Sequence, residues 1–193
     1  MEVLLHFLFQ LFKIAILASI YSFLLILIIS IIKILKPSEF LKKITVEKKK
    51  YWFAFGFIIS IVLLFFSFTY WGNHGLGDGP KIPIGYWKTI ENTNWDEYGY
   101  LNEPKTNAGI NIETTKFKVE NSILCGNLDS SFYVFQNSYF VLDLKTEVLA
   151  EFRTENHFNE YAQNNDLPTS NELLSFSENY KNHWGGIRFF LLP

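Results

Sequence analysis

The candidate metal ligands after residue 70 are His74, Asp78, His157 and His183, with Glu155 and Glu160 close to His157. Three such ligands around an open position would make a catalytic zinc centre. The spacings match neither H-E-x-x-H nor C-x-x-C, so a site would need ligands from distant segments. Surface or helix-capping roles are the simpler interpretation, and we expect no metal and no cofactor.

The segment Thr69–Trp87, TYWGNHGLGDGPKIPIGYW, is rich in glycine and raises the question of a ligand-binding loop. Its spacing is neither that of a dinucleotide fingerprint nor that of a phosphate-binding P-loop, and Asp78 alone cannot supply a calcium loop. Glycine permits positive φ, while Pro80 and Pro83 restrict the chain that follows. We therefore interpret the segment as an ordered connector with tight turns.

Cys125 is the only cysteine, so no intrachain disulfide can form. Its neighbours Ile123 and Leu124 indicate a buried small residue rather than an activated thiolate. The sequence also lacks the G-x-S-x-G motif of a hydrolase nucleophile. The chain is therefore not expected to be an enzyme.

Aromatic side chains are a stronger signal of recognition. Five of them fall within fifteen residues: Tyr86, Trp87, Trp95, Tyr98 and Tyr100. Tyrosine and tryptophan are enriched where proteins bind partners. We predict a partner-binding role for these five. The alternative is that some fill the core and others lie against lipid headgroups.

Two long apolar runs must position whatever follows them. Residues 14–32 and 51–71 contain no charged side chain, and about 20 apolar residues are enough to cross a bilayer. The first run lacks the basic start and small-residue cleavage site of a signal peptide, so we interpret it as an uncleaved span. Aromatic residues at both ends of the second run are predicted interface anchors: Tyr51, Trp52, Tyr70 and Trp71.

The connection between the runs carries seven lysines, which are Lys33, Lys36, Lys42, Lys43, Lys48, Lys49 and Lys50. Lysine-rich short loops stay in the cytoplasm, which places the N-terminus and the C-terminal part outside. Residues 1–70 carry eight lysines and three acids, whereas residues 71–193 carry nine basic and sixteen acidic residues. This charge difference marks a domain boundary.

We therefore predict four regions. Residues 1–36 form the first transmembrane helix with an N-terminal extension, 37–50 a cytoplasmic loop, 51–71 the second transmembrane helix, and 72–193 an extracytoplasmic domain. His6, Gln10 and Lys13 would form a polar stripe near one end of the first helix. That stripe either reaches the headgroups or faces a partner helix or pore.

The outer domain is expected to be α+β. Short alternating runs at 110–113, 116–120, 131–136, 139–144 and 147–152 predict an antiparallel β meander. Two helices follow, the first capped by Thr154 and the second carrying Leu173, Phe176, Tyr180 and Trp184 on one face. We expect the helices to cover one face of a single twisted sheet, and 187–193 to form an edge strand or fill the core.

These features predict a membrane protein with an N-terminal two-helix transmembrane hairpin and a small α+β domain. Fifteen lysines against two arginines, with frequent asparagine, indicate a bacterial chain. The leading hypothesis is an inner-membrane protein whose outer domain binds a protein partner, in an accessory or immunity-like role. An oligomeric two-span pore or effector and a periplasmic metal-dependent enzyme are the alternatives. Lipid and a protein partner or second copy are expected, and nucleic acid is not.

Overall fold

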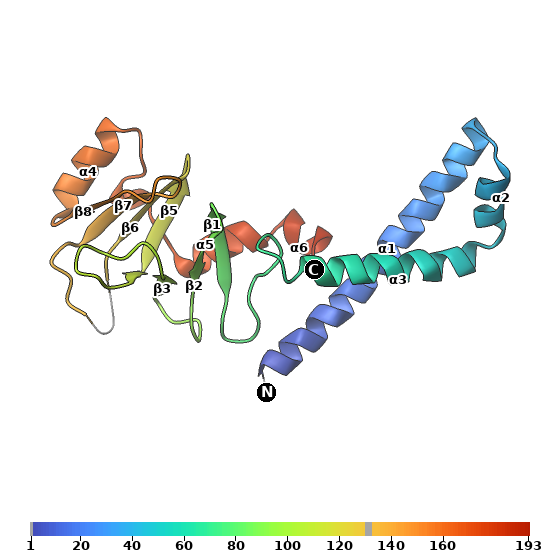
Figure 1. Cartoon of the computed structure of the whole chain (residues 1–193), viewed down its shortest axis with the longest axis horizontal. Coiled ribbons are helices and arrows are strands. Elements are labelled where there is room, and N and C mark those ends of the chain that lie inside the picture. Colours follow the sequence, from blue (N-terminus) through green and yellow to red (C-terminus); the bar gives the residue numbers. More distant parts are fainter. Residues whose placement is uncertain (1, 130–132) are drawn as a thin grey trace. The chain divides into compact units, whose positions relative to one another are not determined.

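The computed structural model describes residues 2–129 and 133–193. The chain forms two compact units, each described by itself below. The helical unit comprises residues 1–73 together with 187–193, and the strand unit comprises residues 74–186. The elements of both units are labelled in Figure 1.

The helical unit is built on two helices that are long and apolar enough to cross a membrane. They are α1 (Glu2–Leu35) and α3 (Lys48–Phe66). Where they pack, Ile14, Leu17 and Ala18 of α1 form a buried cluster with Leu63 of α3. A Cβ added at Gly56 would lie 3.4 Å from the Ser22 hydroxyl oxygen, so small residues set the close approach of the two helices.

The connection between α1 and α3, predicted to be only a loop, contains a short helix. Helix α2 (Glu39–Val46) begins at Ser38, whose hydroxyl accepts a hydrogen bond from the Leu41 amide. It buries Ile44. The second long helix also ends earlier than the predicted residue 71, because Ser67 and Thr69 turn their hydroxyls back onto main-chain carbonyls and the chain enters tight turns.

The strand unit contains two antiparallel sheets. The first has the order β1-β2-β3-β4 and consists of β1 (Lys81–Gly85), β2 (Lys88–Glu91), β3 (Gly99–Leu101) and β4 (Ile112–Thr114). The second has the order β8-β7-β6-β5-β9 and consists of β5 (Lys116–Glu120), β6 (Ile123–Asn127), β7 (Tyr139–Asp143), β8 (Leu149–Phe152) and β9 (Leu174–Ser175).

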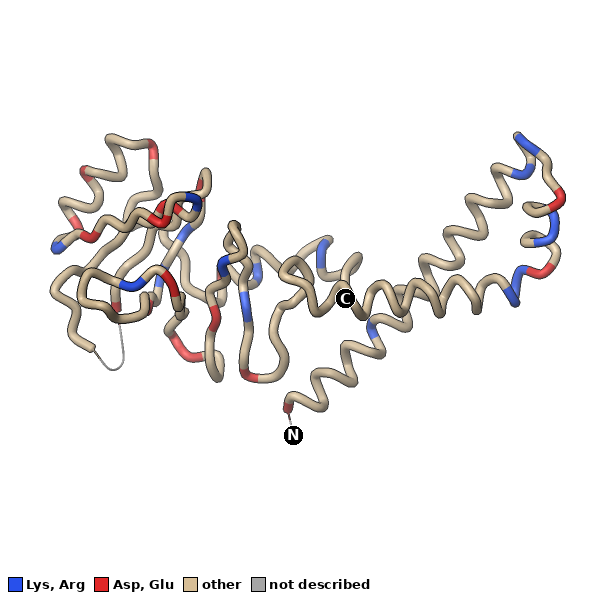
Figure 2. The backbone as a smooth tube through the Cα atoms, in the orientation of Figure 1, with Lys and Arg blue, Asp and Glu red and all other residues tan. Residues whose placement is uncertain are grey.

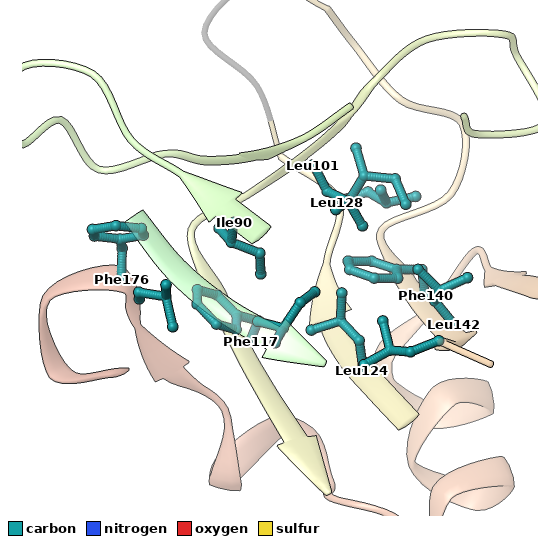
Figure 3. Close-up of a cluster of buried hydrophobic side chains, with 12 residues drawn as sticks. Ile90, Leu101, Phe117, Leu124, Leu128, Phe140, Leu142 and Phe176 are labelled. Atoms are coloured by element: carbon teal, nitrogen blue, oxygen red, sulfur yellow. The ribbon is translucent and has the colours of Figure 1, made fainter. Parts of the chain in front are cut away.

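The main core of the strand unit draws on both sheets. Ile90 and Leu101 of the first sheet share one buried cluster with Phe117, Phe140 and other residues of the second. Figure 3 shows these side chains pointing toward one another, with Phe176 closing one side. The expectation of a single sheet was therefore wrong: the strands divide into two sheets because both sets present apolar residues to a shared core.

The two helices were predicted to cover one face of a single sheet, but they pack into different clusters. Helix α4 (Glu155–Asn164) begins at Thr154, as predicted, and packs Phe158 against Cys125 and Val141 on the sheet face away from the main core. A 3-10 turn (Ser170–Glu172) precedes β9. Helix α5 (Phe176–Trp184) begins later than expected, at the cap Ser175, and its Phe176 enters the main core instead.

Two local predictions were wrong. Residues 133–136 of the predicted strand 131–136 are irregular, while 131 and 132 lie outside the described residues; β6 was not predicted as a strand. The last segment is a helix, α6 (Ile187–Leu191), and not an edge strand. It belongs to the helical unit, so it does not fill the core of the strand unit.

The glycine-rich segment from His74 onward is folded into the strand unit. The Lys81 amide donates to the His74 carbonyl at 3.0 Å, which closes the segment into a loop. Gly75 has φ +88°, and a Cβ there would come within 1.9 Å of the Gly79 carbonyl oxygen. This close approach requires glycine, and the segment is ordered, in agreement with its interpretation as a connector.

Candidate functional site

The turn between β1 and β2 holds two aromatic residues in an unusual backbone conformation. Gly85 pairs with Lys88, so the loop consists of Tyr86 and Trp87 alone. Their φ angles are 50° and 62°. Two positive φ angles in a two-residue loop define a type I′ turn, for which Asn-Gly is the favoured sequence.

Aromatic residues are poorly suited to this conformation. The left-handed region costs roughly 1–2 kcal/mol per residue for a side chain with a Cβ. The rings are not buried in return, since Trp87 is 78% exposed and Tyr86 is 49% exposed. A strained turn that displays aromatic rings to solvent is typical of a functional position.

Two other turns of the strand unit lie beside this one. The Tyr86 hydroxyl is 3.3 Å from the Ser122 hydroxyl in the β5–β6 turn. Lys88 forms an ion pair of 2.6 Å with Glu147 in the β7–β8 turn. The Leu144 amide donates to the Ser122 carbonyl at 3.0 Å, which connects the second and third turns. We call the three turns, residues 86–87, 121–122 and 144–148, the loop end.

Two hydrogen bonds to one side chain shape the β7–β8 turn of the loop end. The Asp143 carboxylate accepts hydrogen bonds from the Lys145 and Thr146 amides, at 2.8 and 3.1 Å. These donors keep the pKa of Asp143 below its usual value. Val148, next to Glu147, is 65% exposed and adds apolar surface. The loop end therefore combines exposed aromatic and aliphatic side chains with an ion pair.

The other three predicted aromatic residues lie elsewhere. Trp95 and Tyr98 belong to the β2–β3 connection, at the opposite end of β2 from the loop end, and Tyr100 lies within β3. Trp95 packs edge-on against Tyr180 of α5, with ring centroids 5.0 Å apart. The structure therefore does not bring the five aromatic residues into one surface.

The first and last residues of the strand unit both lie close to the start of β1. The Trp184 indole donates to the Lys81 carbonyl at 2.7 Å, close to the Lys81–His74 hydrogen bond. The unit is entered at His74 and left after Gly186. Because the Tyr86–Trp87 turn follows the other end of β1, the loop end is remote from both connections within this unit.

The candidate metal ligands are not gathered into a site. The rings of His74 and His183 both contact Trp184, at centroid distances of 5.7 and 4.6 Å, whereas His157 lies in the first turn of α4. Within residues 2–129 and 133–193, no group of three or more His, Cys, Asp and Glu side chains is placed to hold a metal ion.

The thiol of Cys125 is buried between the second sheet and α4. Burial raises its pKa to about 12, which leaves almost no thiolate at neutral pH. This environment does not suit a nucleophile.

We expect Cys125 in the folded chain to react with a maleimide at pH 7.5 about a thousandfold more slowly than in the urea-unfolded chain. The low thiolate fraction and the closed surroundings both slow the reaction. Mass spectrometry of timed samples measures it. Complete labelling of the folded chain within minutes would contradict the placement of this residue.

The predicted membrane-interface residues divide into two groups. Trp52 donates its indole N–H to the Ser19 carbonyl at 3.2 Å, so its ring packs against α1, and Tyr51 contacts Phe55. Tyr70 and Trp71 follow α3, with ring centroids 4.9 Å apart.

Figure 2 shows lysines gathered on and beside α2, where α1 and α3 are connected.

Sequence reasoning missed Ser122, Glu147 and Val148 as parts of the loop end. The separators Asn121-Ser122 and Lys145-Thr146 do indicate turns. Only the strand register places those turns beside Tyr86 and Trp87.

Comparison with protein-family models, with curated proteins and with solved structures gives no match for this chain.

Proposed function

We propose that the chain is a two-span bacterial inner-membrane protein that binds a protein partner outside the cytoplasm through its loop end. The observation that carries the binding function is the pair of exposed aromatic residues held in left-handed conformations at Tyr86 and Trp87. A polar Asn-Gly turn would form the same hairpin without the cost of the left-handed conformation, and the exposure of both rings leaves that cost poorly offset by burial.

The surfaces of α1 and α3 support the membrane location. Phe53, Phe57 and Phe65 of α3 are between 69% and 72% exposed, and many aliphatic residues of α1 are exposed as well. Exposed apolar area of this extent is unfavourable in water and favourable in lipid. The two helices are of the length that a bilayer requires.

Lysine placement supports the proposed orientation. The α1–α3 connection carries the seven lysines of the predicted topology signal (Figure 2). Such a loop stays in the cytoplasm, so His74–Gly186 would face the periplasm. The amphipathic helix α2 suits the inner headgroup region, with Ile44 buried and Lys42 and Lys43 exposed to solvent or anionic lipid.

The polar stripe of α1 gives little support to the pore alternative. Gln10 is 5% exposed, and the Lys13 ammonium lies 4.1 Å from the centroid of the Phe189 ring. A pore-lining stripe must contact water, whereas Gln10 is buried within the chain and Lys13 is half-buried beside the Phe189 ring.

Site-specific photocrosslinking in intact cells tests the binding function. A benzophenone amino acid replaces Trp87 in one strain and the exposed Gln163 of α4 in another. We expect a discrete protein adduct from position 87 and none from position 163. Absence of an adduct at 87, or equal adducts at both positions, would contradict a binding role for the loop end.

A further inference from the structure

The segment 187–193 makes contacts that differ from those of the helix before it. Gly185 and Gly186, the latter with φ +60°, end α5 and redirect the chain. Helix α6 (Ile187–Leu191) then joins the helical unit and not the strand unit. Its position after the glycines makes it an element separate from α5.

Polar and ring contacts attach α6 to the rest of this unit. The Arg188 guanidinium donates to the Trp71 carbonyl at 2.7 Å, just beyond the end of α3. The Lys13 ammonium lies over the Phe189 ring, a cation–π contact. The Tyr21 hydroxyl donates to the Leu191 carbonyl. The segment thus runs from the end of α3 along α1.

The contacts leave a large apolar surface on α6. Ile187 is 77% exposed, Phe190 is 73% exposed, and Leu191 is 50% exposed. The stretch of α1 that it follows, from Lys13 to Tyr21, also displays Ile16 and Ile20. The exposed face of α6 therefore continues the apolar face of a helix that is long enough to cross a membrane.

We infer that α6 is a third membrane-bound element, an interfacial helix that occupies the headgroup–acyl boundary of the outer leaflet. This inference rests on the proposed membrane location of α1 and α3. Lys13 and Tyr21 are eight residues apart, about 12 Å along a helix, so α6 stays within the roughly 15 Å that one leaflet contributes to the hydrocarbon core. Arg188 beside Trp71 lies at the headgroup level, where guanidinium and indole groups are both favoured.

The consequence is that the strand unit is tethered at both of its connections. The chain enters it after α3 and leaves it into α6, so both connections lead to lipid-bound segments. Two tethers restrict the rotation of a domain more than one does. The lipid-bound α6 would therefore limit the orientations in which the loop end is presented.

Fluorescence quenching on the full chain in phosphatidylcholine–phosphatidylglycerol vesicles tests the inference. Three variants place a cysteine-linked fluorophore at exposed sites: Phe190→Cys in α6, Ile58→Cys in α3 and Ser177→Cys in α5. Cys125 remains unlabelled because its thiol is buried. Nitroxide-bearing lipid quenches labels in the bilayer, and iodide quenches labels in water.

We expect the label at 190 to be quenched by nitroxide lipid, as the label at 58 is. Its iodide quenching constant should be at least threefold below that of the label at 177. Iodide quenching at 190 equal to that at 177, with position 58 still in lipid, would overturn the inference and leave the membrane hairpin intact. Iodide access at both 190 and 58 would overturn the inference together with the proposed membrane location.

Discussion

A chain with Asn-Gly in place of Tyr86-Trp87 is expected to be more stable than the parent chain and to lose its partner. Both replaced residues have positive φ, which asparagine and glycine adopt at little cost. We expect the strand unit to gain about 1–3 kcal/mol in free energy of unfolding. The crosslinked adduct should fall at least tenfold, because the two exposed rings would be absent.

Two measurements separate the gain in stability from the loss of binding. The urea dependence of Cys125 labelling reports unfolding of the strand unit alone, since this thiol is buried in it. A benzophenone at Val148, which is 65% exposed beside Glu147, reports binding without using position 87. An unchanged adduct from Val148 would show that the aromatic pair does not bind the partner.

Asp166→Gly provides the matched control. Asp166 also has positive φ, at 52°, in the connection that follows α4, and it is not part of the three turns of the loop end. Its replacement by glycine should stabilise the strand unit in the same way and leave the adduct unchanged. A loss of adduct in this control would mean that relief of backbone strain, and not loss of the rings, weakens binding.

Gly75→Ala is expected to destabilise the strand unit by about 3 kcal/mol or more. Gly75 has φ +88°, and the added Cβ would lie 1.9 Å from the Gly79 carbonyl oxygen and 2.8 Å from the Pro80 Cα. Because both neighbours are backbone atoms, the loop must open to admit the methyl group. Opening would break the Lys81–His74 hydrogen bond that closes it.

Gly109→Ala separates the steric effect from the conformational one. Gly109 has φ +77°, but nothing lies within 4 Å of a Cβ built there. Its replacement should cost only about 1 kcal/mol. Cys125 labelling in urea again measures both variants. Equal losses for Gly75→Ala and Gly109→Ala would contradict a closely packed connector.

Apolar runs and caps allowed much of the fold to be predicted. An uncharged stretch of 19 residues leaves few alternatives to a long helix, and the Thr154 cap marked the start of α4 correctly. The division into two sheets could not be predicted from alternation. At that division the Asn127 side-chain oxygen accepts hydrogen bonds from the Thr115 and Lys116 amides, a long-range contact that alternation does not reveal.

The candidate site was predictable only in part. Composition drew attention to Tyr86 and Trp87, but the same reasoning grouped them with Trp95 and Tyr98, which follow the other end of β2. Strand register decides which turns meet, and register depends on long-range pairing. The role of 187–193 was missed because an apolar segment fits a protein core and a lipid surface equally well by composition.

Thiol accessibility in intact cells tests the central claim, that the chain crosses the membrane twice and presents the strand unit outside the cytoplasm. Gln163→Cys places a thiol on α4 and Val46→Cys places one at the end of α2, both at exposed positions. Cys125 gives little background. A membrane-impermeant maleimide should label position 163 in intact cells and position 46 only after lysis. Labelling of position 46 in intact cells, with position 163 protected until lysis, would contradict the proposed orientation and place the loop end in the cytoplasm.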